Sequence, residues 1–482
     1  MKHYKQFFWI YCCLIFIAAG ARAQDFKYLE YDTDLIPGQV YKERREKLMQ
    51  QIGNEAVAIF YANPERNRNA DLEFPYAPNS DFYYLTGFRE PNAILVLIPK
   101  GTAAQNPSDS TAKITVREML FVQKRDPISE KWEGRRYGAA GAMKLRGLEY
   151  AATNDKFKTM LPSIFWGAGA KFLYVPPFRE DLSGEIAELL QPLKSSLDQM
   201  QQWHAQIETR DPTPLVRKMR VIKSPEEIAL LAKATEISAM AHRQAMMSVE
   251  PGMGEYELEA VYEYIFRKLG AEQNGYPCIV ASGENSVILH YNTNRRKIKD
   301  GDVVLADCAA EYRGYSSDIT RTYPANGKFT KAQREIYQLV LEAQKAAIAA
   351  MKPGVTWQAL SKISRDTIME GLFKLGIIKE KTPQELSRFS YHGLGHPVGL
   401  NVHDVGQSTM EAGMVYTVEP GIYIAEGSEG IDSAYYNIGV RIEDVILVTA
   451  DGSKNLSAAA PREIAEIEAL MKQKGVGNLA IQ

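Results

Sequence analysis

The chain has 482 residues, with 57 lysines and arginines against 59 aspartates and glutamates and a formal charge of −2. This balance, without long basic runs, argues against nucleic acid or an anionic membrane surface as a partner. A chain of this length is expected to form two or three domains with ample hydrophobic core.

The N-terminal residues 1–23 have the pattern of a secretory signal peptide. Two lysines precede an apolar run from Phe7 to Ala19, and an Ala-Arg-Ala triplet ends just before Gln24. The run is too short for a membrane-spanning helix and has the wrong flanks. We therefore expect a mature chain that begins at Gln24, is secreted or periplasmic, and has no stable membrane insertion. The alternative is a buried N-terminal helix.

Residues 24–215 are predicted to form an N-terminal α/β domain, because short apolar runs alternate with segments of helical spacing. The predicted strands are Glu55–Tyr61, Ala93–Ile98, Met119–Gln123 and Lys171–Val175, and the predicted helices are Val40–Ile52 and Leu182–Leu193. Lys100–Lys113 is rich in glycine, serine, asparagine and proline, which predicts a surface loop. We find no constellation of metal ligands or nucleophiles in this domain.

The second domain, residues 216–475, is predicted to follow a break in regular structure at Asp-Pro-Thr-Pro, 211–214. Ser224–Glu227 forms a capping box with proline at the first helical position, so a long amphipathic helix opens the domain. Another helix is predicted to start at Thr330, and Ile464–Met471 forms the last one. Helices over one face of an antiparallel sheet make an α+β fold.

Between these helices, Val303–Tyr323 has the pattern of a β-hairpin, with an apolar run followed by β-branched and aromatic residues. A turn centred on Tyr312 and Arg313 would place Asp307 and Asp318 directly opposite each other, with Cβ atoms about 5 Å apart. Like charges at that distance destabilise a sheet unless a cation lies between them. One interpretation is therefore a metal site, and the other is a solvated pair of aspartates on an exposed hairpin.

Later segments favour the metal site. Residues 391–403 hold three of the seven histidines of the chain, set among glycines, which is more typical of a site than of a core. A strand-like segment then carries Glu419 just before a Pro-Gly turn signal. In the alternating segment Val440–Val448, Arg441 and Glu443 share one face. A buried Glu443 with a purely structural role would need Arg441 or some other cation beside it.

Five of these residues, in this order and setting, resemble the dinuclear metal site of the methionine aminopeptidase and prolidase clan. They are Asp307, Asp318, His396, Glu419 and Glu443. The surrounding motifs look most like those of the Xaa-Pro aminopeptidases, also called aminopeptidase P. These motifs are S-G-E-N-S-V-I-L-H-Y at 282–291, D-I-T-R-T-Y-P at 318–324, H-G-L-G-H at 392–396, V-H-D-V-G at 402–406, T-V-E-P-G-I-Y at 417–423 and G-V-R-I-E-D at 439–444. The resemblance extends upstream to residues 68–88 and so covers nearly all of the chain.

The resemblance implies an α+β protein in which an N-terminal α/β creatinase-like domain precedes a C-terminal pita-bread catalytic domain. That fold consists of two related halves, each contributing strands to one curved sheet, although the sequence itself shows no convincing repeat. The resemblance also implies a homo-oligomer, either a dimer or a tetramer.

The resemblance further implies two divalent metal ions. Asp318 and Glu443 would bridge them, Asp307 would bind one ion, and His396 and Glu419 would bind the other. One histidine with four carboxylates suits manganese or a similar hard ion, and two divalent ions balance four negative charges. Two such ions lower the pKa of a water between them, and Glu419 is the residue expected to help move its proton.

Other residues match family positions around the substrate. His290, His392 and His403 match residues that hold the scissile carbonyl or the proline side of the peptide, or shuttle protons. Tyr423 and Arg441 match pocket positions, and Arg441 is expected to orient a ligand carboxylate.

Asp71 and Trp132 match positions near the substrate pocket, in some members reached from a neighbouring subunit. Without the resemblance, they would be interpreted as a helix or turn aspartate and a half-buried tryptophan.

The expected function is a metallo-aminopeptidase that releases the N-terminal residue from peptides with proline in the second position. An Xaa-Pro bond has no N–H, so a site that accepts it must hold the proline ring and the carbonyl instead. A prolidase, which cuts Xaa-Pro dipeptides, would share every ligand and is the alternative. A binding protein on the same fold is expected to lack a ligand, whereas all five are present.

Overall fold

The computed structural model describes residues 31, 33–107, 109–179, 182–202 and 207–479. The predicted signal peptide, residues 1–23, lies outside them. The chain divides into two compact units, one ending at Pro212 and the other beginning at Thr213. Among the described residues, no helix combines the length and the apolar character that a membrane crossing needs.

The first unit is built around a six-stranded mixed sheet in the order β6-β5-β4-β1-β7-β8. The strands are β1 Ala56–Tyr61, β4 Ile94–Asn106, β5 Asp109–Val122, β6 Ala151–Thr153, β7 Phe172–Tyr174 and β8 Glu208–Arg210. β1 pairs antiparallel with β4 and parallel with β7. It is buried at all six positions, which is typical of a strand covered on both faces.

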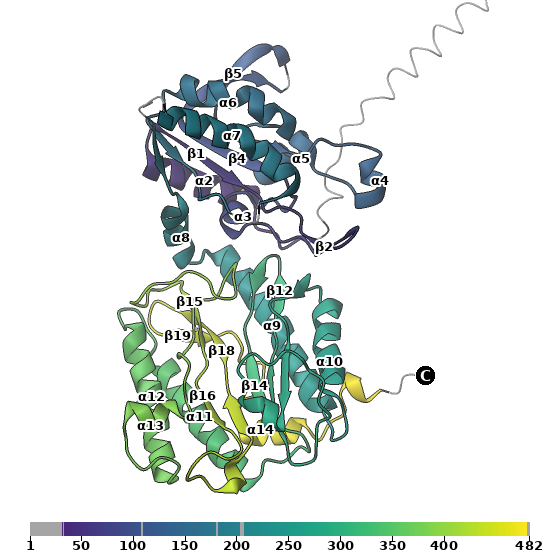
Figure 1. The fold of residues 1–482 in the computed structure, drawn as a ribbon, viewed down its shortest axis with the longest axis vertical. Coiled ribbons are helices and arrows are strands. Elements are labelled where there is room, and N and C mark those ends of the chain that lie inside the picture. The colour runs from purple at the N-terminus through teal and green to yellow at the C-terminus, as the bar shows by residue number, and fades with distance from the viewer. Residues whose placement is uncertain (1–30, 32, 108, 180–181, 203–206, 480–482) are drawn as a thin grey trace, which may run out of the picture. The chain divides into compact units, whose positions relative to one another are not determined.

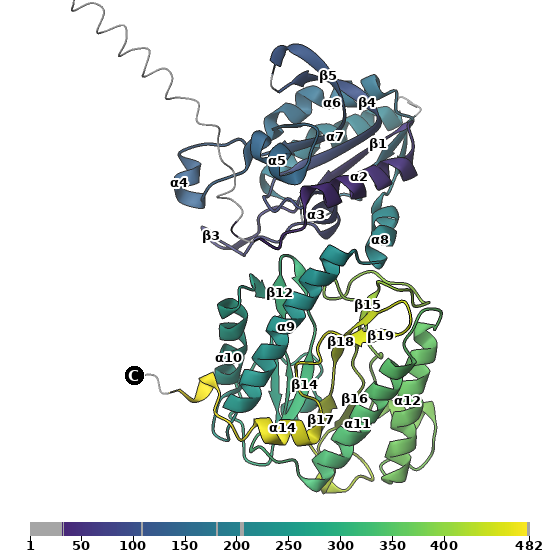
Figure 2. The ribbon, with the colours of Figure 1, turned by 180° about the vertical axis from the view of Figure 1, so that it is seen from behind.

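Helices cover both faces of this sheet. α6 and α7 lie over one face in Figure 1, and α2 and α5 lie over the opposite face in Figure 2. The helices of the unit are α2 Gly38–Ile52, α3 Ser80–Thr86, α4 Ser129–Glu133, α5 Gly138–Arg146, α6 Phe157–Ala168 and α7 Gly184–Gln202. The core between sheet and helices includes Phe121, Phe157 and Leu190. The layered α/β character predicted for this region is confirmed.

The predicted loop at Lys100–Lys113 is wrong, because β4 and β5 form one long hairpin there. Their ladder shifts register between Leu97 and Thr102 and then continues to Asn106 and Asp109. Thr102 is buried, and its Oγ1 donates to the carbonyl of Ser163 at 3.2 Å. Loops are rich in polar residues, and so are strands that extend past the hydrophobic core and are held by backbone hydrogen bonds alone. Composition could therefore not distinguish a loop from a hairpin here.

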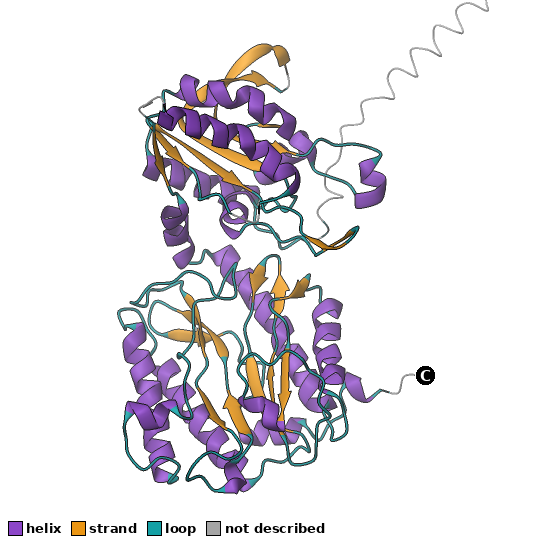
Figure 3. Cartoon of the chain, viewed as in Figure 1, coloured by secondary structure: helices purple, strands orange, loops and turns teal. Residues whose placement is uncertain are grey.

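The second unit has helices on one side of several short antiparallel sheets, so the α+β class is confirmed. Figure 2 shows α9, α10, α11 and α12 in front of the strands, which face the viewer in Figure 1 and are drawn in orange in Figure 3. The helices are α8 Thr213–Val221, α9 Pro225–Ser248, α10 Glu255–Lys268, α11 Lys331–Ala350, α12 Trp357–Lys374, α13 Pro383–Ser387 and α14 Ile464–Leu470.

The strands of the second unit form the three-stranded sheets β10-β11-β14, β13-β12-β9 and β15-β18-β19 and the pair β16-β17. Their bounds are β9 Gln273–Asn274, β10 Ile279–Ser282, β11 Val303–Asp307, β12 Ala310–Tyr312, β13 Tyr315–Ser316, β14 Thr320–Pro324, β15 Val415–Val418, β16 Gly421–Ile424, β17 Ile438–Arg441, β18 Asp444–Val448 and β19 Ser453–Asn455.

The predicted helix starts of the second unit are confirmed. At the start of α9, the Glu227 N–H donates to Ser224 Oγ, and the Ser224 N–H donates to Glu227 Oε2 at 3.0 Å. Thr330 caps α11 in the same way. The predicted break at residues 211–214 is wrong in part, because α8 begins at Thr213. Pro214 stands in its first turn, where a missing N–H is tolerated.

The hairpin between β11 and β14 has a different register from the predicted one. Arg313 and Gly314 have φ of 54° and 80°, as a two-residue type I′ turn requires. The turn is therefore centred one residue later than predicted, and Asp307 pairs with Thr320 instead of Asp318. Since side chains alternate with a period of two, this shift of two residues leaves both aspartates on the same face.

Two predicted strands are interrupted at the residues of interest. Val440–Val448 is not one strand, because β17 ends at Arg441 and β18 begins at Asp444. β15 and β16 are likewise separated at Glu419. β15 and β18 belong to one sheet and β16 and β17 to another, so both glutamates lie where the chain passes between sheets.

Candidate metal centre

The second unit brings four carboxylates and one imidazole together at its strand ends. Asp307 ends β11, Asp318 lies just before β14, and Glu419 and Glu443 occupy the two strand interruptions. Ligand-type atoms of Asp318, His396 and Glu443 all lie within 4.8 Å of one another. His396 Nε2 is 3.3 Å from Asp318 Oδ2 and 3.6 Å from Glu419 Oε1.

Backbone contacts orient His396 toward these carboxylates. Its N–H donates to Thr417 Oγ1 at 3.0 Å, and the Thr417 N–H donates to the His396 carbonyl at 2.8 Å. The ring Nδ1 lies 3.1 Å from the carbonyl of Pro397. A carbonyl can only accept, so Nδ1 carries a hydrogen and Nε2 faces the cluster.

A tyrosine that the sequence did not single out joins the two aspartates. Tyr276 Oη lies 2.5 Å from Asp307 Oδ1 and 2.6 Å from Asp318 Oδ1. A phenol has only one hydrogen to donate. Tyr276 can therefore donate to only one of the two aspartates. The other short contact needs a proton on that aspartate or a cation between the two oxygens.

Arg441 links three parts of the cluster. Its Nη2 donates to Asp307 Oδ2 at 2.8 Å, its Nη1 to Tyr423 Oη at 3.0 Å, and its Nε to Thr320 Oγ1 at 3.0 Å. The Thr320 hydroxyl donates in turn to Glu443 Oε2 at 2.7 Å. Although Arg441 was predicted to share a strand face with Glu443, it contacts Asp307 directly and reaches Glu443 only through Thr320.

The electrostatics of the cluster favour added cations. Burial raises the pKa of Asp307 and the pKa of Glu443, and repulsion from Asp318 raises both further. Burial also raises the pKa of Glu419, to about 7. Burial disfavours the charged ring of His396, but Asp318 and Glu419 together raise its pKa to about 9. One arginine and one imidazolium cannot neutralise four carboxylates. The oxygen-rich donor set fits divalent cations.

The other predicted histidines line one cavity of about 620 Å³ together with all five candidate ligands. His392 Nδ1 donates to the Gly393 carbonyl at 2.8 Å, and its Nε2 accepts from Tyr423 Oη at 2.8 Å. Burial, with help from Arg441, lowers the pKa of His392 to about 4, so this ring is neutral at pH 7. The apolar part of the lining is Pro277, Ile279, Leu289 and Val402.

His290 and His403 also line this cavity and have exposed rings. The ring of His403 lies 3.9 Å from that of His396, centroid to centroid. Burial and the neighbouring His396 lower the pKa of His403. Both histidines are therefore placed where a molecule entering the cavity would meet them.

Asp71 and Trp132 belong to the first unit. Asp71 is exposed between β2 Asn67–Asn69 and β3 Leu72–Glu73, and Trp132 is 87% exposed on α4. Neither is among the residues that line the cavity. Their roles toward a substrate stay predictions.

Tyr276, Thr320 and Thr417 contact the candidate ligands but were not identified from the sequence. Tyr276 is outside any regular element, and the pairings of Asn274 with Ala310 and of Ile279 with Asp307 bring it to the aspartates. Thr320 lies inside a motif already noted for its resemblance, directly after the Asp318-Ile319 pair. Thr417 likewise opens the motif T-V-E-P-G-I-Y at 417–423. These positions did not indicate which residue either hydroxyl would contact.

Two family models match the chain. The one described as metallopeptidase family M24 matches residues 229–450, and the one described as aminopeptidase P, N-terminal domain, matches residues 41–174. The Xaa-Pro aminopeptidase of Escherichia coli (strain K12) is 41% identical over 452 residues, covering 90% of this chain and 98% of the relative. Xaa-Pro aminopeptidase 3 of Homo sapiens is 34% identical over 451 residues, covering 90% and 86%.

Solved structures agree with these sequence matches. Aminopeptidase P from Escherichia coli, in complex with the inhibitor Pro-Leu, matches with a TM-score of 0.81 at 40% identity, covering 91% of this chain and 98% of the other. Aminopeptidase PepP of Pseudomonas aeruginosa matches with a TM-score of 0.82 at 38% identity, covering 91% and 99%.

Proposed function

Because the chain belongs to the Xaa-Pro aminopeptidase family of the M24 metallopeptidases, we propose that it releases the N-terminal residue from peptides with proline in the second position. Its fold is accordingly a creatinase-like N-terminal domain followed by a pita-bread catalytic domain. The observation that carries the proposal is the cluster of four carboxylates and one imidazole in a single cavity. A prolidase, acting on Xaa-Pro dipeptides, is the alternative.

The proposed cofactors are two divalent metal ions, with manganese as the expected metal. Asp307, Asp318, His396, Glu419 and Glu443 would hold them. Bound there, the ions would supply an acidified water and would polarise the scissile carbonyl. The preference for manganese is supported by the excess of carboxylate oxygens over nitrogen in this set.

Glu419 is the proposed proton carrier of the reaction. Without metal, burial raises the pKa of this carboxylate to about 7, and a carboxylate beside a metal-activated water can take up its proton and pass it on. Its Oε2 lies 4.0 Å from Nδ1 of the His392 ring, which is neutral at pH 7. A proton on Oε2 is therefore not repelled by a positive charge on that ring. His392 is engaged at both ring nitrogens by Gly393 and Tyr423, which supports a role in fixing the cavity wall.

The proposed preference for proline is supported by the composition of the cavity wall. Imidazole rings of His290 and His403 and apolar side chains such as Leu289 and Val402 line it together. Flat rings and aliphatic groups suit a pyrrolidine ring, which has no N–H to be satisfied. Arg441 would keep Asp307 and Tyr423 in place beneath this wall.

Asp71 and Trp132 are proposed to contact the substrate as part of a homo-oligomer, a dimer or a tetramer. The support is that Leu72 and Phe74, which follow Asp71 closely in the sequence, and Trp132 itself are exposed apolar side chains. Trp132 is 87% exposed, Leu72 58% and Phe74 52%. Exposed apolar groups of this size gather at surfaces that bind other molecules.

We further propose that the protein is secreted or periplasmic, because residues 1–23 have the pattern of a cleavable signal peptide. The two cysteines left after such cleavage, Cys278 and Cys308, are buried as free thiols. A mature N-terminus at Gln24 in protein from a native extracellular or periplasmic fraction would support this location, and an uncleaved chain in the cytoplasm would contradict it.

The test of the function compares three substrates with metal-free and manganese-loaded protein. A tripeptide with proline second should be cut after its first residue, and the same peptide with alanine second should be cut at least tenfold more slowly. Chelation should abolish the activity and manganese should restore it. Equal rates for the proline and alanine peptides would refute proline specificity, and cleavage of Xaa-Pro dipeptides alone would favour prolidase.

A further inference from the structure

We propose that His242 and Gln344 are a matched pair of positioning residues. Each would orient two of the four carboxylates of the metal centre by hydrogen bonding to the backbone next to them. His242 lies on α9 and Gln344 on α11, and both side chains are completely buried, at 0% exposure. The inference rests on the proposed metal centre, since it concerns how that centre is built.

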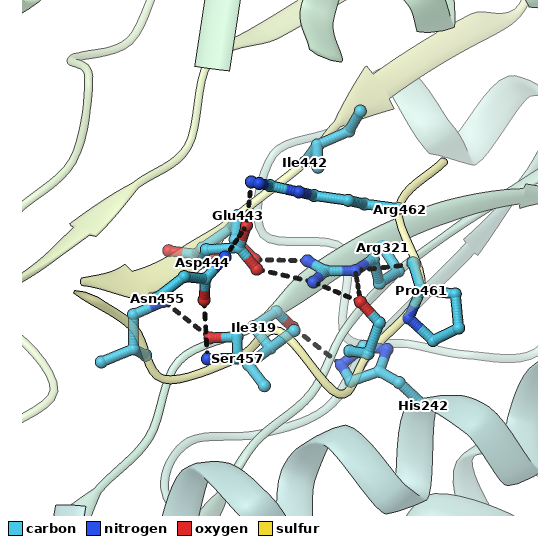
Figure 4. Close-up of polar contacts among 12 residues, drawn as sticks. His242, Ile319, Arg321, Ile442, Glu443, Asp444, Asn455, Ser457, Pro461 and Arg462 are labelled. Atoms are coloured by element: carbon cyan, nitrogen blue, oxygen red, sulfur yellow. Dashed lines mark hydrogen bonds and ion pairs between the residues drawn. The ribbon is translucent and has the colours of Figure 1, made fainter. Parts of the chain in front are cut away.

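His242 acts on the two aspartates. Its Nε2 lies 3.1 Å from the carbonyl oxygen of Cys308 and 3.0 Å from that of Ile319, the contact visible in Figure 4. Both carbonyls can only accept, so Nε2 carries the hydrogen and shares it between them. Cys308 directly follows Asp307, and Ile319 directly follows Asp318. One ring nitrogen therefore joins the backbone at both aspartates.

Gln344 acts in the same way on the two glutamates. Its Nε2 donates to the carbonyl of Val418 at 3.1 Å and to that of Ile442 at 3.0 Å. Val418 directly precedes Glu419, and Ile442 directly precedes Glu443. The amide has two hydrogens, so each carbonyl receives its own bond.

Both side chains are held at their far ends as well. Tyr262 Oη lies 3.1 Å from His242 Nδ1, which accepts because Nε2 carries the ring hydrogen. Arg462 Nη1 donates to Gln344 Oε1 at 2.8 Å and to Asp444 Oδ2 at 2.6 Å, the latter in Figure 4. Burial lowers the pKa of His242 to about 3, so its ring is neutral. Each donor is thus fixed and carries no charge of its own.

The position of the four carbonyls explains why such bonds would matter. They lie after β11, before β14, at the end of β15 and after β17, where regular strand pairing stops. A residue at a strand end is not fixed by a continuous ladder, so a bond to the adjacent carbonyl limits the direction of the ligand side chain. Metal ligands need such outer contacts, whose loss typically lowers metal affinity about 10–100-fold.

The experiment measures Mn²⁺ binding to the full chain by titration calorimetry after the metal has been removed with a chelator. His242→Leu and Gln344→Met each remove the shared donor, and both should weaken Mn²⁺ binding at least tenfold. His242→Gln supplies an amide that can bond both carbonyls, as Gln344 does in its own place, and should stay within about threefold of the unmodified protein. Circular dichroism checks that each variant is folded.

Gln333→Met is the matched control. Gln333 is also buried on α11, and its Nε2 donates at 2.7 Å to the carbonyl of Gly301, which is not beside a ligand. This variant should lose thermal stability as Gln344→Met does, but keep its Mn²⁺ affinity. If His242→Leu does not fold, the pair Gln344→Met and Gln333→Met decides the question.

Three outcomes are distinguishable. Binding within twofold of the unmodified protein in folded Gln344→Met would overturn the inference and leave the proposed function standing. An equal loss of Mn²⁺ affinity in Gln333→Met would also overturn it, because the effect would then be a general loss of stability. Failure of the unmodified protein to bind Mn²⁺ would overturn the proposed metal centre itself.

Discussion

Glu90 in the first unit is a half-buried glutamate whose ionisation opposes folding. Burial raises its pKa to about 7, although the Tyr137 N–H donates to its Oε1 at 2.7 Å. Its Oε2 is buried and accepts no hydrogen bond from any residue that the structure describes. The folded protein therefore holds a proton on Glu90 at pH values where the unfolded chain has already released it.

This difference predicts a pH-dependent effect of Glu90→Gln. The folded pKa of about 7 exceeds the ordinary value of 4.5, so stability from this group is present below pH 4.5 and is lost as the pH rises through about 7. Glutamine cannot ionise, and at pH 8 the variant should be more stable by about 1–3 kcal/mol. Denaturant unfolding of both proteins at pH 4.5 and pH 8 checks this, and the same difference at both pH values would contradict it.

At the level of single residues, the sequence revealed charged ligands better than their neutral partners. Asp307, Glu419 and the histidines could be recognised because charge and imidazole are rare in apolar surroundings. Tyr276 and Gln344 gave no such signal. Their partners are aspartates or backbone carbonyls distant in sequence, which only the finished fold brings within reach.

At the scale of elements, patterning located most helices and strands but missed where strands end. The capping residues Ser224 and Thr330 mark helix starts by local chemistry, so the sequence could show them. The strands are interrupted at Glu419 and Glu443 because the segments on either side of each glutamate join different sheets. Which sheet a segment joins depends on partners far away in the sequence. The hairpin turn was misplaced by one residue because Arg313 is an unusual residue for a left-handed position.

The turn itself can be tested with Gly314→Ala. Gly314 has φ of 80°, a conformation that costs an alanine about 1–2 kcal/mol. The variant should lose about that much stability in denaturant unfolding. Gly314→Asn should lose less, since asparagine tolerates this region better. An alanine variant as stable as the unmodified protein would show that the turn is not held in the described conformation.

At the scale of the whole molecule, each unit has its own hydrophobic core, and the candidate metal ligands all belong to the second. A ligand that binds only the folded state adds stability by mass action, about 2.7 kcal/mol at a concentration 100 times its Kd. Calorimetry should therefore show two unfolding transitions, of which manganese raises one and a chelator lowers the same one. A metal-dependent shift of both transitions would contradict this assignment.

The order of the ligands along the chain has a kinetic consequence. The set runs from Asp307 to Glu443, and its members lie at the ends of strands or between them, in segments that helices and loops separate along the chain. Contacts between residues so far apart form only after long stretches of chain have closed. The ions would thus meet their complete set of ligands only when folding is nearly finished. An interaction absent from the transition state slows unfolding and leaves the folding rate unchanged, so manganese should prolong the lifetime of the folded enzyme without speeding its formation.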